Sequence, residues 1–369
     1  MSALQPATAS VAKTLALRVA RNRHVTFWMR EFDAAWSVDT LRARVVDIVA
    51  ETHDVRTFVL APNRRWPGHL AGQFVTVEVE VEGVLLQRCY SISSPPGDGP
   101  IAITVKRVAG GRVSTWMHER LRRGDVVTLG PPMGEFVAPA GASKLLLLSG
   151  GSGATPVMSI LRDLARRGAT SDVVYVHAAR SKRDILFERE LATLAGRHPG
   201  LRVAFRTDDD PAGAFGPAGQ ARLDRITLRA TVPDFEDRDT MLCGPPAMMA
   251  ALAPIWADAG IGHRLKTERF IREARVDAPG DLTPTKVTLS LVRSGRVIAT
   301  DRSETLLEQL ERAGERPESG CRMGICNTCV CRKRSGVVED VVTGKVSSEP
   351  DEDIRLCVSR ARTDVEIAL

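Results

Sequence analysis

Long apolar runs are missing from this chain of 369 residues, since no stretch of about 18 consecutive apolar residues occurs in it. The sequence therefore predicts no membrane-spanning helix. The stretch 1–17 also lacks the basic start and the continuous apolar segment of a secretory signal. We expect a cytoplasmic protein.

Several catalytic signatures are missing too. The chain has no G-x-S-x-G elbow, no Walker loop and no zinc pattern. Its 7 histidines form no ligand pair at helical spacing, so we assign them no chemistry. The length predicts two or three domains, and 43% hydrophobic with 26% charged residues is typical of a soluble globular chain. The net charge of +6 favours acidic partners, and no nucleic-acid partner is expected.

The cysteines are few, but the spacing of four of them is informative. Their total of 7 is too low for a disulfide scaffold in a chain of this length. Four of the cysteines follow C-x4-C-x2-C and then a last cysteine after the segment 330–356, which is the ligand spacing of a plant-type [2Fe–2S] cluster. Gly320 and Gly324 allow tight turns that bring amide groups near the sulfurs. Cys331 is left as a neighbour. The predicted metal ligands are Cys321, Cys326, Cys329 and Cys357.

Strand-like patterns dominate residues 41–140. In the stretch 74–81 every second residue from Val75 onward is valine, and Pro/Gly-rich turn signals separate such runs. This pattern predicts a small antiparallel β-barrel. Over residues 141–273 short apolar strands alternate with helical segments, which predicts an α/β domain with a doubly wound parallel sheet.

The rest of the chain divides into an end domain, a linker and an N-terminal extension. The charged, proline-containing stretch 274–284 predicts a linker, and residues 285–369 are enough for one small α+β domain around the cluster. Residues 1–40 predict a helical extension, because aromatic residues recur there at i, i+4 and i+8. That helix either packs on the next domain or mediates peripheral membrane association.

Two motifs in the barrel region suit a flavin nucleotide. Arg88-Cys-Tyr90-Ser91 combines a phosphate-binding guanidinium with an aromatic ring two residues later, on the same strand face. Lys106 follows, and then Gly110-Gly-Arg-Val-Ser114, whose amides and hydroxyl suit a pyrophosphate.

Two further motifs lie in the α/β region. The stretch 146–156 is an apolar strand, a loop with three glycines and a helix start at Pro156, which together form an anion site. Cys243-Gly244-Pro245-Pro246 ends a later strand, where the cysteine is either near a bound nucleotide or simply buried.

In this order the motifs resemble those of the ferredoxin–NADP⁺ reductase family. The domain order over residues 41–369 resembles reductase components of oxygenases and acyl desaturases that carry a C-terminal ferredoxin domain of the β-grasp type. The resemblance implies that Arg88 holds FAD phosphate, that Tyr90 packs on the isoalloxazine and that Ser91 lies near its N5. It implies that Thr155 lies between nicotinamide and flavin, and that Cys243 lies near the nicotinamide. In the family, residues like Glu268 and Phe270 are often near the flavin.

The motifs and the resemblance together predict the following site residues. The predicted cofactor-binding residues are Arg88, Tyr90, Ser91, Lys106, Gly111, Val113, Ser114, Gly150, Gly151, Gly153, Thr155, Arg180, Gly244 and Pro245; the predicted catalytic residues are Ser91, Thr155 and Cys243.

The implied activity is electron transfer from NADPH or NADH through FAD to the [2Fe–2S] cluster, and then to a separate metal-containing oxygenase or fatty acyl desaturase. The alternative is an electron-transfer subunit of a larger dehydrogenase, although the late fourth cysteine argues against it. Arg180, Lys182 and Arg183 either read the 2′-phosphate of NADPH or form a solvated loop. Basic residues beside the cysteines predict an acidic docking face on the partner; they are Arg322, Arg332, Lys333 and Arg334.

Overall fold

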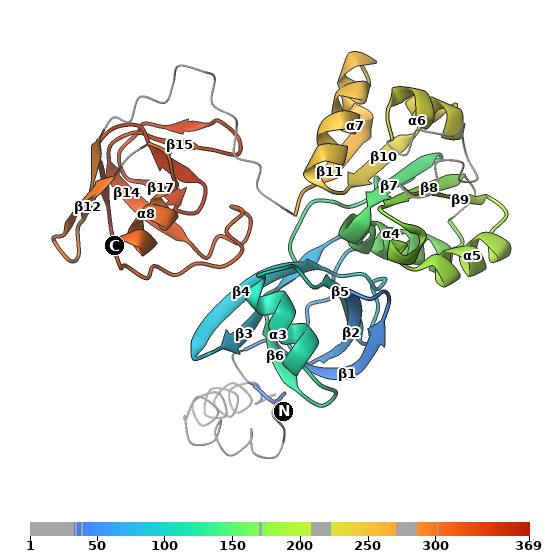
Figure 1. Cartoon of the computed structure of the whole chain (residues 1–369), viewed down its shortest axis with the longest axis horizontal. Coiled ribbons are helices and arrows are strands. Elements are labelled where there is room, and N and C mark those ends of the chain that lie inside the picture. The colour runs from blue at the N-terminus through green and yellow to red at the C-terminus, as the bar shows by residue number, and fades with distance from the viewer. Residues whose placement is uncertain are drawn as a thin grey trace, which may run out of the picture.

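The computed structural model describes residues 33, 35–37, 40–169, 172–207, 223–270, 286–300 and 302–369. These residues form three units along the chain (Figure 1). Most of the predicted N-terminal helix and the whole predicted linker lie outside the described residues. Among the described residues, no helix is long and apolar enough to cross a membrane.

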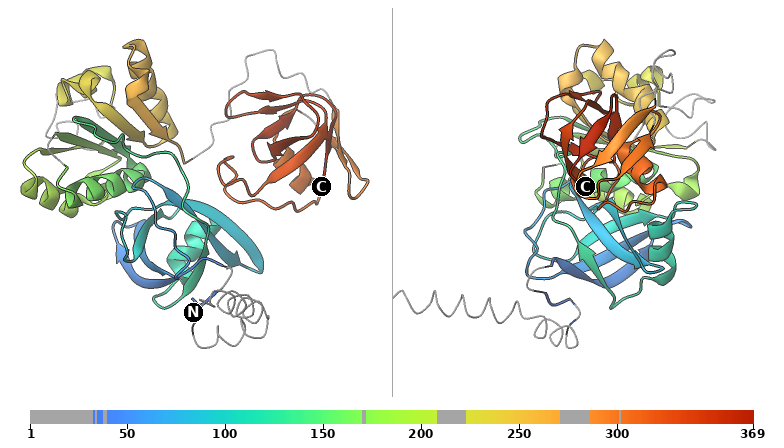
Figure 2. Two further views of the ribbon diagram at one scale, coloured as in Figure 1. Left: turned by 180° about the vertical axis from the view of Figure 1, so that it is seen from behind. Right: turned by 90° about the vertical axis from the view of Figure 1, so that its left-hand side faces the viewer.

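The first unit is a six-stranded antiparallel sheet that curls into the predicted barrel (Figure 2). Its order is β4-β3-β6-β1-β2-β5, and an antiparallel bridge between Ile92 and Ile103 connects its two ends. The alternating valines of residues 75–81 lie in its core, as the period-2 pattern predicts. Its elements are β1 (Arg42–Ala50), β2 (Val55–Pro62), β3 (Phe74–Val81), β4 (Val84–Ser91), β5 (Ile101–Lys106), α3 (Arg112–Arg120) and β6 (Val126–Leu129).

The second unit is a parallel sheet in the order β11-β10-β7-β8-β9. One face is covered by α4 and α5 and the other by α6 and α7, so its strands are buried on both sides, as a doubly wound fold requires. Its strands are β7 (Leu145–Gly150), β8 (Val173–Ala179), β9 (Leu201–Thr207), β10 (Asp239–Cys243) and β11 (Leu265–Glu268). Its helices are η1 (Gly151–Gly153), α4 (Ala154–Arg166), η2 (Lys182–Asp184), α5 (Glu188–Arg197), α6 (Arg225–Thr231), η3 (Phe235–Asp237), α7 (Pro246–Asp258) and η4 (Gly262–Arg264).

The third unit is an α+β fold with a mixed five-stranded sheet in the order β13-β12-β19-β14-β17, in which β12 and β19 are parallel. A smaller sheet, β16-β15-β18, lies beside it. The helix α8 begins at a capping box in which Thr305 and Glu308 satisfy each other's amide groups. The elements are β12 (Val287–Leu291), β13 (Val297–Thr300), α8 (Leu306–Arg312), β14 (Val330–Ser335), β15 (Val338–Asp340), β16 (Val346–Ser347), β17 (Glu352–Arg355), β18 (Ser359–Ala361) and β19 (Val365–Ile367).

The glycine loop between β7 and α4 depends on the missing side chain of Gly153. A Cβ built on Gly153 would lie 2.2 Å from the backbone oxygen of Cys243 in β10. Since backbone atoms cannot move aside cheaply, only glycine lets α4 begin this close to the neighbouring strand. Gly153 thus sets the position of the loop, and it does not line either of the two cavities described in the next subsection.

We predict that Gly153→Ala lowers the free energy of unfolding of the second unit by about 2 kcal/mol, because the added methyl overpacks this contact. Thermal unfolding of the holoprotein measures the change. Gly196→Ala in α5 is the matched control, since a Cβ there meets nothing within 4 Å. Equal melting temperatures for the two variants would contradict the assignment.

Candidate flavin, nucleotide and cluster sites

A cavity of about 320 Å³ lies at the open end of the barrel. Strand β4 turns Arg88 and Tyr90 to the same side, Gly111 lies just before α3, and the hydroxyl of Ser114 comes from the first turn of α3. Thr155, at the start of α4, forms part of the wall, and its hydroxyl donates to the carbonyl of Ser152 at 3.0 Å. The predicted barrel residues that line this cavity are Arg88, Tyr90, Ser91, Lys106, Gly111, Val113 and Ser114.

Glu268 is a half-buried acid in the wall of this cavity. It ends β11, where it is paired with Cys243 of β10, and it lines the cavity wall. The Ser91 hydroxyl donates to its Oε2 at 3.5 Å. Burial raises the pKa of the Glu268 carboxyl to about 8, and the bond from Ser91 offsets only part of that rise. Glu268 can therefore hold a proton at neutral pH beside Ser91.

Cys243 lies behind this wall. It is fully buried and lines neither large cavity. Burial, and then the charge of Glu268, raise the pKa of its thiol well above the ordinary value. A protonated, enclosed thiol is a poor nucleophile. Because Cys243 does not line either cavity, its predicted position near the nicotinamide stays a prediction.

A second cavity, of about 540 Å³, lies at the carboxyl ends of the parallel strands. That edge is where open α/β sheets bind their ligands. Ser152, Arg269 and Phe270 line both cavities, so the two spaces adjoin. Lys182 and Arg183 do not line the second cavity. The predicted residues that do line it are Lys106, Gly150, Gly151, Arg180, Gly244 and Pro245.

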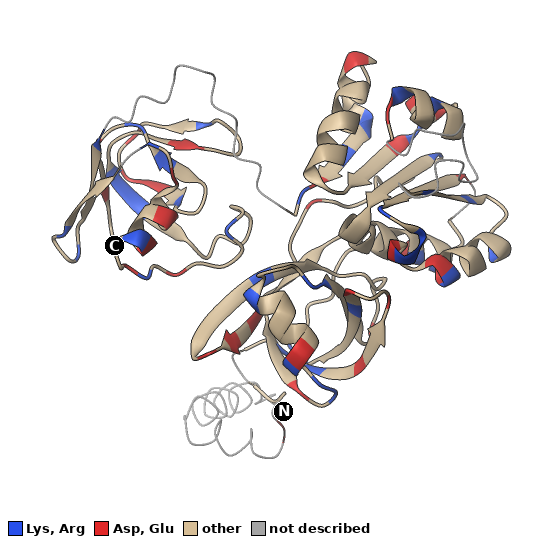
Figure 3. Ribbon diagram, viewed as in Figure 1, with Lys and Arg blue, Asp and Glu red and all other residues tan. Residues whose placement is uncertain are grey.

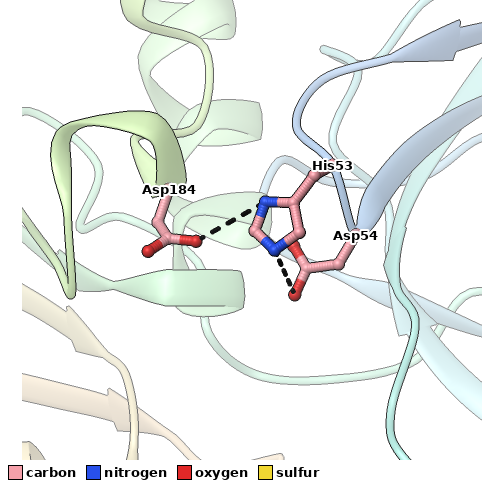
Figure 4. A group of neighbouring side chains, drawn as sticks. All are labelled: His53, Asp54 and Asp184. Carbon is pink, nitrogen blue, oxygen red and sulfur yellow. Dashed lines mark ion pairs between the residues drawn. The ribbon is translucent and has the colours of Figure 1, made fainter.

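Two carboxylates at the second cavity were not predicted from the sequence. Asp54 lies in the β1–β2 turn and Asp184 in η2, and His53 stands between them (Figure 4). The two ring nitrogens of His53 lie 3.9 Å from an oxygen of Asp54 and 3.9 Å from one of Asp184. Lys106 Nζ is 3.2 Å from Asp54. No motif signals this cluster, because it forms only where the barrel meets the nucleotide unit.

The four predicted metal ligands come together in the third unit as two pairs. The backbone amides of Met323 and Cys326 donate to Cys321 Sγ, both at 3.3 Å, and the amide of Cys321 donates to Cys326 Sγ at 3.2 Å. Cys329 contacts Cys357 through its thiol. A Cβ on Gly320 would lie 2.8 Å from Cys326 Sγ.

Two pairs of thiols, with amide donors aimed at sulfur, suit a cluster with two irons. The donor set therefore fits the predicted [2Fe–2S] group. Cys331 is buried among apolar residues of the same unit, in line with its prediction as a neighbour.

The loop that holds Cys321 and Cys326 also forms part of the wall of the first cavity, of about 320 Å³, which we call the flavin cavity. Met323 and Ile325 line that cavity together with β4 residues. A Cβ on Gly320 would lie 2.8 Å from the side-chain oxygen of Gln87, so loop and strand are in direct contact. Sequence reasoning did not assign Met323, Ile325 or Gln87 to the site. The predicted cluster ligands Cys321 and Cys326 thus flank the loop residues that form one wall of the flavin cavity.

The comparisons with known proteins agree with this geometry. An oxidoreductase FAD-binding domain family matches residues 42–137, an oxidoreductase NAD-binding domain family matches 147–253, and a 2Fe-2S iron-sulfur cluster binding domain family matches 291–362. An NADPH oxidoreductase of Mycobacterium tuberculosis is 36% identical, over 89% of this chain and 84% of its own length. A glycine betaine monooxygenase reductase subunit of Chromohalobacter salexigens is 32% identical, over 90% and 96%.

The chain belongs to the family of oxygenase reductase components with a C-terminal [2Fe–2S] domain. The crystal structure of phthalate dioxygenase reductase shares the fold of this reductase, with a TM-score of 0.59 and 24% identity over 90% of this chain and 98% of that one. The predicted fold class is confirmed. The reductase is an NAD(P)H-dependent oxidoreductase whose cofactors are FAD and a [2Fe–2S] cluster.

We predict a pH effect on stability at Glu268. The folded carboxyl keeps its proton up to a pKa of about 8, whereas the unfolded one loses it near 4.5. Between these values the unfolded state binds fewer protons, so the free energy of unfolding falls as the pH rises. Glu268→Gln removes this fall, measured by denaturant unfolding at pH about 5 and about 8. Glu80→Gln, at an exposed position of β3, should keep it; an unchanged pH dependence in Glu268→Gln would contradict the assignment.

We predict that Cys357→Ser abolishes the visible absorbance of the cluster and the reduction of cytochrome c, while flavin absorbance and ferricyanide reduction remain. Cys331→Ser is the matched control and keeps both activities, because Cys331 is buried in the same unit without being a ligand. Absorbance spectra and the two assays on purified protein measure this. Loss of the cluster in the control variant would show that the ligand set is wrong.

Proposed function

We propose that this reductase passes electrons from NADPH or NADH through FAD to its [2Fe–2S] cluster, and then to a separate oxygenase. The observation that carries the proposal is the shared wall of the flavin cavity. One cavity is bounded by β4, by Thr155 and Phe270 of the nucleotide unit, and by Met323 beside the cluster ligands.

Positioning is the main work of the protein in this function. When bound, FAD converts two-electron into one-electron transfer and the cluster carries single electrons. Arg88 and the amides at the start of α3 would hold flavin phosphates, and Tyr90 would pack against the ring. Ser91 and Glu268 hold a proton at the flavin cavity, and Met323 lines the side of that cavity nearest the predicted cluster ligands.

The acceptor is proposed to be an oxygenase. This is supported by the glycine betaine monooxygenase reductase subunit and by the ferredoxin reductase component of 3-ketosteroid-9-alpha-monooxygenase of M. tuberculosis, which is 31% identical over 88% of this chain. No observation on the described residues favours an acyl desaturase or a larger dehydrogenase. Peripheral membrane association through residues 1–40 stays a prediction, because most of that segment lies outside the described residues.

The basic docking face predicted beside the cysteines contains fewer exposed basic residues than expected. Lys333 is fully buried, and its Nζ donates to the carbonyls of Gly336 and Glu349 at 2.8 and 2.6 Å, so that part of the prediction is wrong. A period-2 strand pattern turns this residue inward. Arg332 and Arg334 stay half-exposed, in ion pairs with Asp353 and Asp351. Figure 3 shows acidic and basic residues interleaved on this unit.

An anaerobic titration of the purified protein with NADPH and with NADH tests the proposal. We expect one of the two to bleach the flavin and then to lower the cluster absorbance, since both carriers lie on one path. Adding a purified Rieske-type oxygenase should then restore the oxidised cluster spectrum. A protein without visible absorbance, or a flavin that neither nucleotide reduces, would refute the proposed function.

A further inference from the structure

The side chain of Gln87 lies between the barrel and the cluster loop (residues 320–326). Gln87 belongs to β4, where its cross-strand partner is Glu78 of β3. Its Nε2 donates to Glu78 Oε2 at 2.7 Å, and its side-chain oxygen lies 2.8 Å from the point that a Cβ on Gly320 would occupy. One side chain therefore contacts the barrel through its nitrogen and the cluster unit through its oxygen.

Glu78 fixes which end of the Gln87 amide faces the loop. An ionised carboxylate only accepts hydrogen bonds, so the amide nitrogen of Gln87 turns toward Glu78 and the oxygen is left on the side of Gly320. Both side chains are half-buried, and water therefore competes less for the bond between them. Gln87 thus presents a fixed oxygen to the cluster loop.

The point of contact on the loop lies beside two cluster ligands. Gly320 directly precedes Cys321 and is buried. The same Cβ position on Gly320 lies 2.8 Å from Cys326 Sγ and 2.9 Å from Thr328 Oγ1. Because Gly320 has no side chain to separate them, Gln87 packs directly against the part of the loop that carries the first two ligands.

Gln87 is also joined to the flavin cavity through its backbone. The Arg88 guanidinium donates to the carbonyl of Gln87 at 2.7 Å, and Arg88 lines that cavity whereas Gln87 does not. On the loop side the cavity is lined by Met323 and Ile325, and Ile325 remains 40% exposed. Apolar burial at this contact is therefore incomplete, which leaves a larger share of the docking to the polar contact at Gln87.

Resting on the function proposed above, we infer that Gln87 is a positioning residue that holds the cluster loop against the flavin cavity, with Glu78 orienting its amide. The step it supports passes one electron from reduced flavin to the oxidised cluster, and no bond or proton changes at Gln87. The supply of electrons from the nucleotide does not depend on it, because the two cavities adjoin at Ser152, Arg269 and Phe270.

Anaerobic stopped-flow absorbance of the full-length holoprotein tests the inference by separating flavin reduction from cluster reduction. Gln87→Leu keeps the length of the side chain and removes both polar ends. We expect flavin-to-cluster transfer to slow about threefold to tenfold, the effect of one lost hydrogen-bonded contact on the docked population. Flavin reduction, ferricyanide reduction and the cluster absorbance should hold, since the carbonyl that accepts from Arg88 is backbone.

Exchanging the two partners gives a rescue test. Gln87→Glu alone sets two carboxylates against each other and should slow the same step at least as much. Adding Glu78→Gln restores the net charge of the pair, reverses donor and acceptor, and leaves an oxygen facing Gly320, so the double variant should recover the rate. Leu85→Glu is the matched control, because it adds a carboxylate beside Glu80 in the next pair of the same strands, where Leu85 is 61% exposed.

Hydrogen exchange of the holoprotein without nucleotide gives a readout that needs no turnover. Amides of residues 320–326 should exchange faster in Gln87→Leu and Gln87→Glu than in wild type, and at the wild-type rate in the double variant. An unchanged flavin-to-cluster rate in Gln87→Leu, or a double variant no faster than Gln87→Glu, would overturn the inference.

Two outcomes are kept apart from that result. If Gln87→Leu does not retain its cluster, the comparison of Gln87→Glu with the double variant decides alone. If neither nucleotide reduces the flavin of the wild-type protein, the proposed function itself has failed, which is a separate result from a failure of the inference on Gln87.

Discussion

The contact between the cluster loop and strand β4 is the constraint on which the electron path depends. Met323 and Ile325 lie between two ligand cysteines in the sequence and at the same time line the flavin cavity. A Cβ on Gly320 would lie 2.8 Å from both the side-chain oxygen of Gln87 of β4 and the Cys326 sulfur, so the two segments pack closely at this glycine. Two units separated by the whole nucleotide unit in the sequence are therefore in contact where single electrons must cross.

Half-buried carboxyl groups are the second theme of these sites. Glu268 and Asp184 are both carboxylates in cavity walls, and each has at most one hydroxyl donor from the described residues, Ser91 and Ser181 respectively. The consequences differ. Burial raises the pKa of the Glu268 carboxyl to about 8, so this group can hold a proton at neutral pH, whereas Asp184 faces the guanidinium of Arg180 at 3.6 Å. The local surroundings thus give the same functional group, a carboxyl, two chemical uses.

Local motifs made much of this site predictable. Arg88 and Tyr90 share a strand face, the glycine loop begins a helix, and the cysteine spacing encodes a cluster, so each needs only its own segment. The buried Lys333 and the cluster of His53, Asp54 and Asp184 could not be predicted in this way. Their surroundings come from distant segments, and a charged residue in a strand pattern looks the same whether it faces solvent or two carbonyl groups.

Rapid-freeze EPR during a single anaerobic turnover tests the central claim most directly. The protein is mixed with one equivalent of its preferred nucleotide, and the reduced-cluster signal is followed beside the flavin absorbance. A path through the shared cavity wall predicts that cluster reduction keeps pace with steady-state cytochrome c reduction. A flavin that stays fully reduced while the cluster remains oxidised over many turnover times would contradict the account.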